Sequence, residues 1–144
     1  MNELCHAEVF EFHRFLMKWY SGRDEPDKLT FTEFSDVLDT EFALVTPYGR
    51  IVSREDLLTA VWEAYGAHAR AKGPFRVWVE RFEGRPLTPE LHLCTYEEWQ
   101  WVDARTRIRQ TTAIFRKSEM ARNGVEWVHV HETWLTPSKL DTPA

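Results

Sequence analysis

The hydrophobic residues of the first 73 positions recur mainly with a helical period. From residue 4 to about residue 23, large apolar side chains repeat every three to four positions and form one stripe, as in an amphipathic helix. A capping-box sequence at Thr30–Glu33 predicts the start of a second, short helix that ends near Asp39. Ser53 can cap a third helix, which Gly73-Pro74 ends. The pattern therefore predicts three helices in the first half of the chain.

Beyond Pro74 the hydrophobic period shortens from about 3.6 to about 2 residues, which marks the change from helix to extended chain. Four alternating runs follow, with short connections and an Asn123-Gly124 turn before the last run. The predicted long strands are 75–82, 91–102, 105–117 and 125–135, and a short strand at 42–45 precedes the third helix. We therefore expect an α+β fold in which N-terminal helices pack on a curved antiparallel sheet.

Composition narrows the class of protein. The 144 residues are enough for one core, and a content of 43% hydrophobic and 14% aromatic residues is ample to fill it. We expect a single domain over residues 1–136, followed by a loose tail over residues 137–144. The net charge of −5 is spread along the chain without a basic stripe, so nucleic acid is not an expected partner. Because no secretory signal and no membrane-spanning window are present, we expect a cytoplasmic protein without a membrane partner.

The two cysteines, Cys5 and Cys94, lie far apart in the sequence, one in a predicted helix and one in a predicted strand. Their spacing matches neither a disulfide framework nor a set of metal ligands. The pair His129 and His131 lacks a recognisable third ligand. We therefore expect two reduced thiols, no metal and no cofactor.

The order of these elements, together with the segments Glu41–Gly49, Thr111–Arg116 and Trp127–Trp134, resembles the nuclear transport factor 2-like (NTF2-like) superfamily, which has a cystatin-like cone fold. The chain is most similar to the small stand-alone SnoaL-like proteins, in which a tryptophan begins the last strand and a histidine follows four residues later, here Trp127 and His131. The resemblance implies a strongly curved sheet whose wide side is closed by helices, with a pocket inside the cone. It also implies frequent dimerisation through the opposite face of the sheet. Because this superfamily includes isomerases, dehydratases, cyclases and non-catalytic assembly domains, the resemblance does not select one function.

His131 is the candidate catalytic residue of such a pocket. Residues two apart on a strand share a face, so His131 and His129 would point the same way as Trp127, into the cone. A histidine can exchange a proton near neutral pH. His13 interrupts the apolar stripe of the first helix, and Tyr20 follows it on the same face. These two residues are the groups that would orient His131 or donate to a bound carbonyl. For each of them, a plain packing role in the core is the alternative.

Aromatic and basic residues supply the rest of the predicted pocket, because flat rings suit a flat, apolar ligand. Besides the three catalytic candidates, the predicted pocket residues are Trp62, Tyr65, Trp78, Trp101, Arg109, His129 and Thr133. Arg109 could bind a ligand carboxylate, or it could pair with Glu97 or Glu126.

The connection between the last two strands leaves their relative register open. With a longer loop, the His131 face would carry Phe115 and the other odd-numbered residues of strand 105–117; with a two-residue turn it would carry Ile114 and the even-numbered ones. In both cases Trp127, His129, His131 and Thr133 stay together on one face.

Two functions fit these predictions. One is a cofactor-free isomerase, dehydratase or cyclase that moves a proton on a small apolar carbonyl compound. The other is a non-catalytic ligand-binding or assembly module, whose pocket would be small or plugged by tryptophans. A homodimer through the outer sheet face is expected in either case, because the face assigned to Val128, Val130 and Trp134 is apolar.

Overall fold

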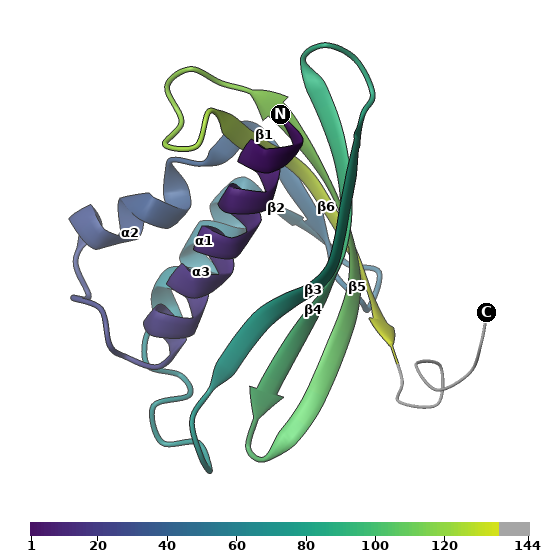
Figure 1. The fold of residues 1–144 in the computed structure, drawn as a ribbon. Coiled ribbons are helices and arrows are strands. Elements are labelled where there is room, and N and C mark those ends of the chain that lie inside the picture. The colour runs from purple at the N-terminus through teal and green to yellow at the C-terminus, as the bar shows by residue number, and fades with distance from the viewer. Residues whose placement is uncertain (136–144) are drawn as a thin grey trace.

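Three helices lie on one face of a six-stranded sheet in a computed structural model that describes residues 1–135 (Figure 1). The helices are α1 (Asn2–Tyr20), α2 (Lys28–Ser35) and α3 (Arg54–Glu63). The strands are β1 (Leu38–Val45), β2 (Ile51–Ser53), β3 (Arg76–Pro86), β4 (Leu91–Val102), β5 (Arg105–Lys117) and β6 (Val125–Leu135). The predicted α+β class, with N-terminal helices packed on a curved sheet, is confirmed. The predicted tail at 137–144 lies outside the described residues.

The strand order is β2-β1-β6-β5-β4-β3. The run from β3 to β6 is the expected antiparallel meander. However, β1 runs parallel to β6, so the sheet is mixed rather than purely antiparallel. The chain between β1 and β6 contains β2, α3 and β3 to β5, and a long connection of this kind permits parallel pairing. Among the described residues, no helix is both long and apolar enough to cross a membrane.

The caps of the two shorter helices differ in how well they follow the sequence pattern. Ser53 caps α3 as predicted, because its hydroxyl accepts a hydrogen bond from the Asp56 amide at 3.1 Å. In α2 the cap is Asp27 instead of the Thr30 capping box, and its carboxylate accepts from the Thr30 amide at 2.8 Å. Both helices also end earlier than the pattern predicts, at Ser35 and Glu63.

The core lies between α1 and the inner face of the sheet. One side of α1 buries residues such as Phe12 and Trp19, at the helical spacing that the sequence predicts. The ring of Trp127 from β6 contacts Phe12 and Phe115, with centroid distances of 4.5 Å to each. The indole N–H of Trp19 donates to the Val61 carbonyl at 2.7 Å, which ties α1 to α3. The helix layer is therefore fixed to the sheet along most of α1.

A β-bulge in β6 reverses the faces of its side chains. Ile114 pairs with His129 whereas Phe115 pairs with Trp127, so Val128 is an extra residue without a partner on β5. Val125 and Trp127 are buried before the bulge, and Val130 and Glu132 are buried after it. Trp127 and His131 thus lie on opposite faces of the sheet, which corrects the expectation that they share one.

The sequence allowed two pairings of β5 with β6, one with the odd-numbered and one with the even-numbered residues of β5 on the His131 face. Each pairing is found in one part of the strands. Trp127 lies opposite Phe115, as a longer loop requires, while His131 lies opposite Thr112. Residues 118–124 form this longer loop, closed by a hydrogen bond from the Ser118 amide to the Gly124 carbonyl at 2.9 Å, so Asn123-Gly124 is not a two-residue hairpin turn. The outer-face assignments of Val130 and Trp134 were wrong for the same reason. Val130 is buried on the inner face, and Trp134 pairs with Arg109, whose side chain leaves that same face.

We predict that replacing the two residues on either side of the bulge has very different effects on stability. Trp127→Ala removes a ring that is 1% exposed and should lower the free energy of unfolding by about 3–5 kcal/mol. His131→Ala, on the exposed side of the same strand, should change it by less than about 0.5 kcal/mol. Urea unfolding of both variants measures this, and similar losses for the two would contradict the assigned faces.

Candidate functional site

A cavity of about 110 Å³ lies between α1 and the inner face of the sheet. Its apolar wall consists of Phe12, Leu16, Phe34, Phe42, Leu44, Leu57, Val61, Trp127 and Val130. Its polar wall consists of His13, Tyr20, Tyr96, Glu98, Arg109 and Glu132. The cavity therefore has an apolar side and a side that carries four ionisable groups of both signs along with two phenols.

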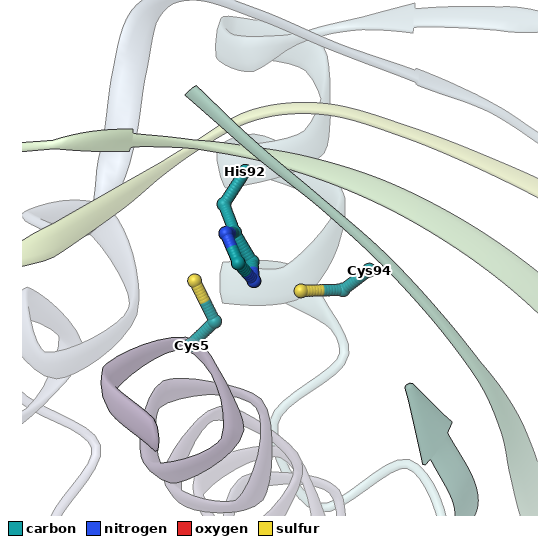
Figure 2. A group of neighbouring side chains, drawn as sticks. All are labelled: Cys5, His92 and Cys94. Atoms are coloured by element: carbon teal, nitrogen blue, oxygen red, sulfur yellow. The ribbon is translucent and has the colours of Figure 1, made fainter. Parts of the chain in front are cut away.

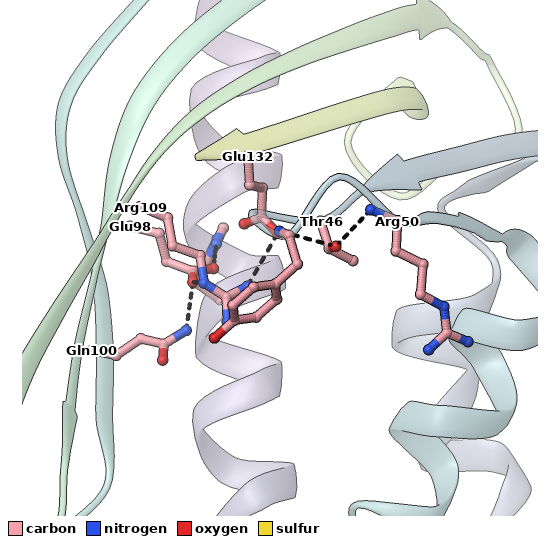
Figure 3. Close-up of polar contacts among 8 residues, drawn as sticks. Thr46, Arg50, Glu98, Gln100, Arg109 and Glu132 are labelled. Carbon is pink, nitrogen blue, oxygen red and sulfur yellow. Dashed lines mark hydrogen bonds and ion pairs between the residues drawn. The ribbon is translucent and has the colours of Figure 1, made fainter. Parts of the chain in front are cut away.

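The charged groups reach the cavity because of the strand registers. Glu98 of β4 lies directly opposite Arg109 of β5, so both side chains leave the same face of the sheet. Glu132 reaches that face because it follows the bulge in β6. His13 comes from the middle of α1, which covers this part of the sheet. Figure 3 shows Glu98, Arg109 and Glu132 gathered beside one another on the sheet.

These groups form one connected network. The His13 Nε2 atom lies 2.8 Å from Glu98 Oε1, and Arg109 Nη1 donates to Glu132 Oε1 at 3.1 Å. Arg109 Nε is 3.7 Å from Glu98 Oε2, an ion pair longer than a hydrogen bond. The second oxygen of Glu98 accepts from Gln100 Nε2 at 2.6 Å. Glu98 thus has two close partners, whereas Glu132 has Arg109 alone among the described residues.

His13 is held as an imidazolium by acceptors on both ring nitrogens. Its Nδ1–H donates to the Val9 carbonyl at 2.7 Å while Nε2–H donates to Glu98. Burial alone would lower the pKa of His13, but the hydrogen bond and charge of Glu98 raise it. Burial would likewise raise the pKa of Glu98, yet the hydrogen bond and charge of His13, with the charge of Arg109, lower it to about 2. This pair is therefore ionised at neutral pH.

Glu132 has the opposite behaviour. Burial, followed by the negative charge of Glu98, raises the pKa of Glu132 to about 7, and Arg109 offsets only part of this. Burial, with the charge of Glu98, also raises the pKa of Tyr20 to about 12, so its hydroxyl keeps its proton. The cavity therefore contains a carboxyl group that can gain or lose a proton near neutral pH and a phenol that stays protonated and can donate a hydrogen bond.

Two buried polar atoms beside this network have no hydrogen-bond partner, namely Arg109 Nε and Thr111 Oγ1. Thr111 is the next inward-facing residue of β5 and lies opposite Glu132. Buried polar atoms are nearly always paired, so these two atoms on neighbouring inward positions of β5 are exceptions among the described residues.

Three of the predicted site residues meet in this cavity, namely His13, Tyr20 and Arg109. The other residues predicted on β6 do not reach it. His131 and Thr133 are exposed, and His129 is on the same outer face, because the bulge at Val128 turns all three away from the helices. The side chain that β6 turns into the cavity is therefore that of Glu132, the neighbour of His131, and not that of His131 as predicted.

The four predicted aromatic pocket residues lie elsewhere. Trp62 is 39% exposed and packs on Trp19 with a centroid distance of 5.6 Å. The Tyr65 hydroxyl donates to the carbonyls of Gly22 and Asp24 and so fastens the end of α1 to the segment after α3. Trp78 stacks on Trp99 across β3 and β4, and Trp101 lies two residues further along β4, where it pairs with Arg76. Their sequence positions carried no information about which face each ring would take.

Glu98 and Glu132 were missed by the sequence reasoning, which paired Arg109 with Glu97 or Glu126. A signal for Glu98 was available. The predicted strands 91–102 and 105–117 leave only Asp103 and Ala104 between them. In the structure both residues have positive φ, at 49° and 62°, as in a two-residue hairpin turn. Such a turn between β4 and β5 places Glu98 opposite Arg109 by counting alone. No comparable signal exists for Glu132, whose face depends on the bulge.

Comparison with known proteins identifies relatives by sequence. The family model described as sucrose-6-phosphate phosphohydrolase C-terminal matches residues 5–136. Sucrose-phosphatase 2 and sucrose-phosphatase 1 of Nicotiana tabacum are each 26% identical over 129 residues, which cover 89% of this chain. The chain spans only 30% of the length of these two enzymes.

Solved structures confirm the NTF2-like fold. An NTF-2-like protein of unknown function from Pseudomonas aeruginosa has a TM-score of 0.80 at 16% identity, over 92% of this chain and 99% of that protein. A CaMKII hub from S. rosetta has a TM-score of 0.61 at 14% identity, over 90% and 95% of the two chains. A putative ketosteroid isomerase from Parabacteroides distasonis has a TM-score of 0.55 at 14% identity, over 85% of each chain. At these identities the likeness concerns the fold alone.

We predict a pH-dependent stability difference between the protein and its Glu132→Gln variant. The pKa of Glu132 rises from 4.5 to about 7 on folding, so the folded state binds the extra proton and the stability that it contributes is lost as pH rises through that window. Relative to the variant, the free energy of unfolding should fall by up to about 3 kcal/mol between pH 4.5 and pH 8. Denaturant unfolding across this range measures the difference, and a pH-independent difference would contradict the raised pKa.

Proposed function

The chain belongs to the sucrose-6-phosphate phosphohydrolase C-terminal family, and on that premise we propose that it is a small-molecule-binding domain whose ligand occupies the cone cavity. The observation that carries this proposal is the unpaired, buried Nε atom of Arg109 beside the protonatable carboxyl of Glu132. Phosphate hydrolysis, from which the two Nicotiana tabacum phosphatases take their names, is not part of the proposal.

The volume of the cavity limits the size of the ligand that can bind in it. Pockets for drug-sized molecules measure roughly 300–1,000 Å³, and a water molecule occupies about 30 Å³. A cavity of about 110 Å³ therefore suits a compound with only a few non-hydrogen atoms. Its apolar wall would contact a short hydrocarbon portion, and Arg109 and Tyr20 would donate to a carbonyl or carboxyl oxygen. The ligand class is a small carbonyl compound with an apolar end.

The same groups support proton transfer on such a ligand without a cofactor. A general base or acid works best when its pKa is near the working pH, as that of Glu132 is. Negative charge that develops on a carbonyl oxygen during proton removal would be stabilised by the Arg109 guanidinium and the neutral Tyr20 hydroxyl. The isomerase, dehydratase or cyclase hypothesis is therefore kept, with Glu132 in the role that the sequence reasoning gave to His131.

Self-association through the outer sheet face is the second candidate function. This face carries the stacked pair Trp78 and Trp99, whose centroids are 5.9 Å apart, and the half-buried Ile114 at the centre of the sheet. Aromatic side chains are enriched in protein interfaces. The CaMKII hub among the structural neighbours is an assembly domain by name, which supports the same idea. We propose a homodimer formed by two such faces, with residues 1–136 acting as one domain.

The binding proposal is tested with pyruvate and acetone as probes, observed by NMR on ¹⁵N-labelled protein. We expect chemical-shift changes for residues of α1 and β5 that line the cavity. Arg109→Lys keeps the positive charge but removes the Nε donor, so it should weaken binding about tenfold. His131→Ala, a matched control on the outer face, should bind as the unchanged protein does. Equal affinity in the Arg109→Lys variant, or shifts confined to the outer face, would refute the cavity assignment.

The dimer proposal is tested by sedimentation velocity at micromolar concentration. The unchanged protein should sediment at twice the monomer mass. Ile114→Lys places a charge at the centre of the outer face and should shift the protein to the monomer with an unchanged circular dichroism spectrum. Lys117→Ala on the exposed end of β5 is the control and should remain dimeric. A monomeric unchanged protein would rule the dimer out.

A further inference from the structure

We propose that Cys5, His92 and Cys94 form a binding site for one thiophilic metal ion. The three residues come from α1 and β4, and in Figure 2 the imidazole of His92 lies between the two sulfur atoms. Two thiolates and an imidazole are ligands that Zn²⁺ and Cu⁺ prefer, whereas Mg²⁺ and Ca²⁺ prefer oxygen. We expect Zn²⁺, with Cu⁺ as its competitor.

The geometry brings the three ligand atoms close together. One ring nitrogen of His92 and the two sulfur atoms all lie within 4.8 Å of one another, and the residues are 0%, 3% and 0% exposed for Cys5, His92 and Cys94. Zinc binds sulfur at about 2.3 Å and imidazole nitrogen at about 2.0 Å, so ligands around one ion are roughly 3.3–3.8 Å apart. Small side-chain movements would therefore close the three atoms around an ion. His92 and Cys94 are two apart on β4, which keeps both on the inner face.

The hydrogen bonding of His92 leaves one nitrogen available as a ligand. Its Nε2 atom lies 2.9 Å from Asn2 Oδ1, and an Nε2–H that donates there leaves the lone pair on Nδ1. The Nδ1 atom is buried and has no hydrogen-bond partner. Metal-binding histidines usually donate their other N–H to an oxygen in this way, which fixes the tautomer and orients the ring. Asn2 would thus be a positioning residue for the site.

Gly84 lies beside the cluster, and its lack of a side chain leaves space for the side chains of the cluster. Gly84 pairs with Cys94 across β3 and β4. A Cβ atom on Gly84 would overlap Asn2 Oδ1 and would lie 2.9 Å from His92 Nε2 and 3.2 Å from Cys94 Sγ. Any other residue at this position would therefore push the side chains of the cluster apart.

This site is separate from the cone cavity, because none of its three residues lines that cavity. Cys5 is eight residues from His13 along α1, or about 12 Å at the rise of an α-helix. A metal ion here would tie the N-terminal part of α1 to β4 and so act as a structural clamp. The expectation of no metal rested on the distance between the two cysteines in sequence, which the packing of α1 on β4 removes.

The test uses the full chain, expressed with a C-terminal tag free of histidine and cysteine and purified under reducing conditions without chelator. Elemental analysis should find about one zinc or copper ion per chain. After metal removal, titration with Co²⁺ should produce thiolate-to-cobalt charge-transfer absorption with a one-to-one endpoint. Zn²⁺ should then displace the cobalt and raise the melting temperature by several degrees. Tight binding of either Zn²⁺ or Cu⁺ supports the site.

Variants separate the site from adventitious binding. Cys5→Ala and Cys94→Ala should each weaken metal affinity at least 100-fold, and Asn2→Ala should weaken it about 10- to 100-fold. Because Asn2 is exposed, its variant should fold normally even if a cysteine variant does not. His131→Ala should leave the affinity unchanged. Absence of metal binding by the reduced protein, affinity that survives both cysteine replacements, or a mass that is lower by two hydrogens from a Cys5–Cys94 disulfide under reducing conditions would overturn the proposal.

Discussion

One extra residue in β6 decides which side chains the cone encloses. Side chains alternate between the two faces of a strand, so the inserted Val128 reverses every position that follows it. Without the bulge, the cavity would face two imidazoles, at 129 and 131. With it, the cavity faces Val130 and Glu132. Because of the bulge, one carboxyl group faces the cavity in place of two imidazoles. Fewer polar side chains of β6 are therefore buried in the core.

The carboxyl group that the bulge turns inward changes the charge balance of the cone. His13 and Glu98 are only 2.8 Å apart and neutralise each other. Arg109 is the cation near both carboxylates. Its Nη1 atom lies 3.1 Å from Glu132 Oε1, and its Nε atom lies 3.7 Å from Glu98 Oε2. Burial and the negative charge of Glu98 raise the pKa of Glu132 to about 7, because Arg109 offsets only part of their effect. Buried ion pairs add little to stability, because the desolvation cost offsets the Coulomb attraction. The proposed ligand binding would give this network, in which Arg109 Nε has no hydrogen-bond partner, a role other than stabilising the fold.

Most of the fold could be predicted from the sequence because it depends on local periods. The apolar stripe of α1 has the spacing of a helix, and the change of period near Pro74 marks the start of the meander. The inward direction of His13 follows from that stripe. The register of β4 and β5, and with it the Glu98–Arg109 pair, follows from a two-residue turn. These features need no knowledge of contacts between distant segments.

The bulge could not be predicted from the same patterns. The segment from Val128 to His131 alternates valine and histidine without interruption, so an unbroken strand with the histidines inward fits it as well as a bulged one. The choice depends on tertiary packing. The ring of Trp127 must meet Phe12 and Phe115, while Val130 must meet the apolar wall of the cavity, and the two demands are compatible only if one residue between them is skipped. The cluster of Cys5, His92 and Cys94 has the same origin, since it exists only once α1 lies on β4.

Helix α1 is the element that connects these features. Its first turn contacts the sheet through Asn2 and His92, its middle through His13 and Glu98, and its last turn contacts α3 through Trp19 and Val61. The cone cavity and the proposed metal site thus share one helix, which contributes His13 to the first and Cys5 to the second, although no side chain belongs to both.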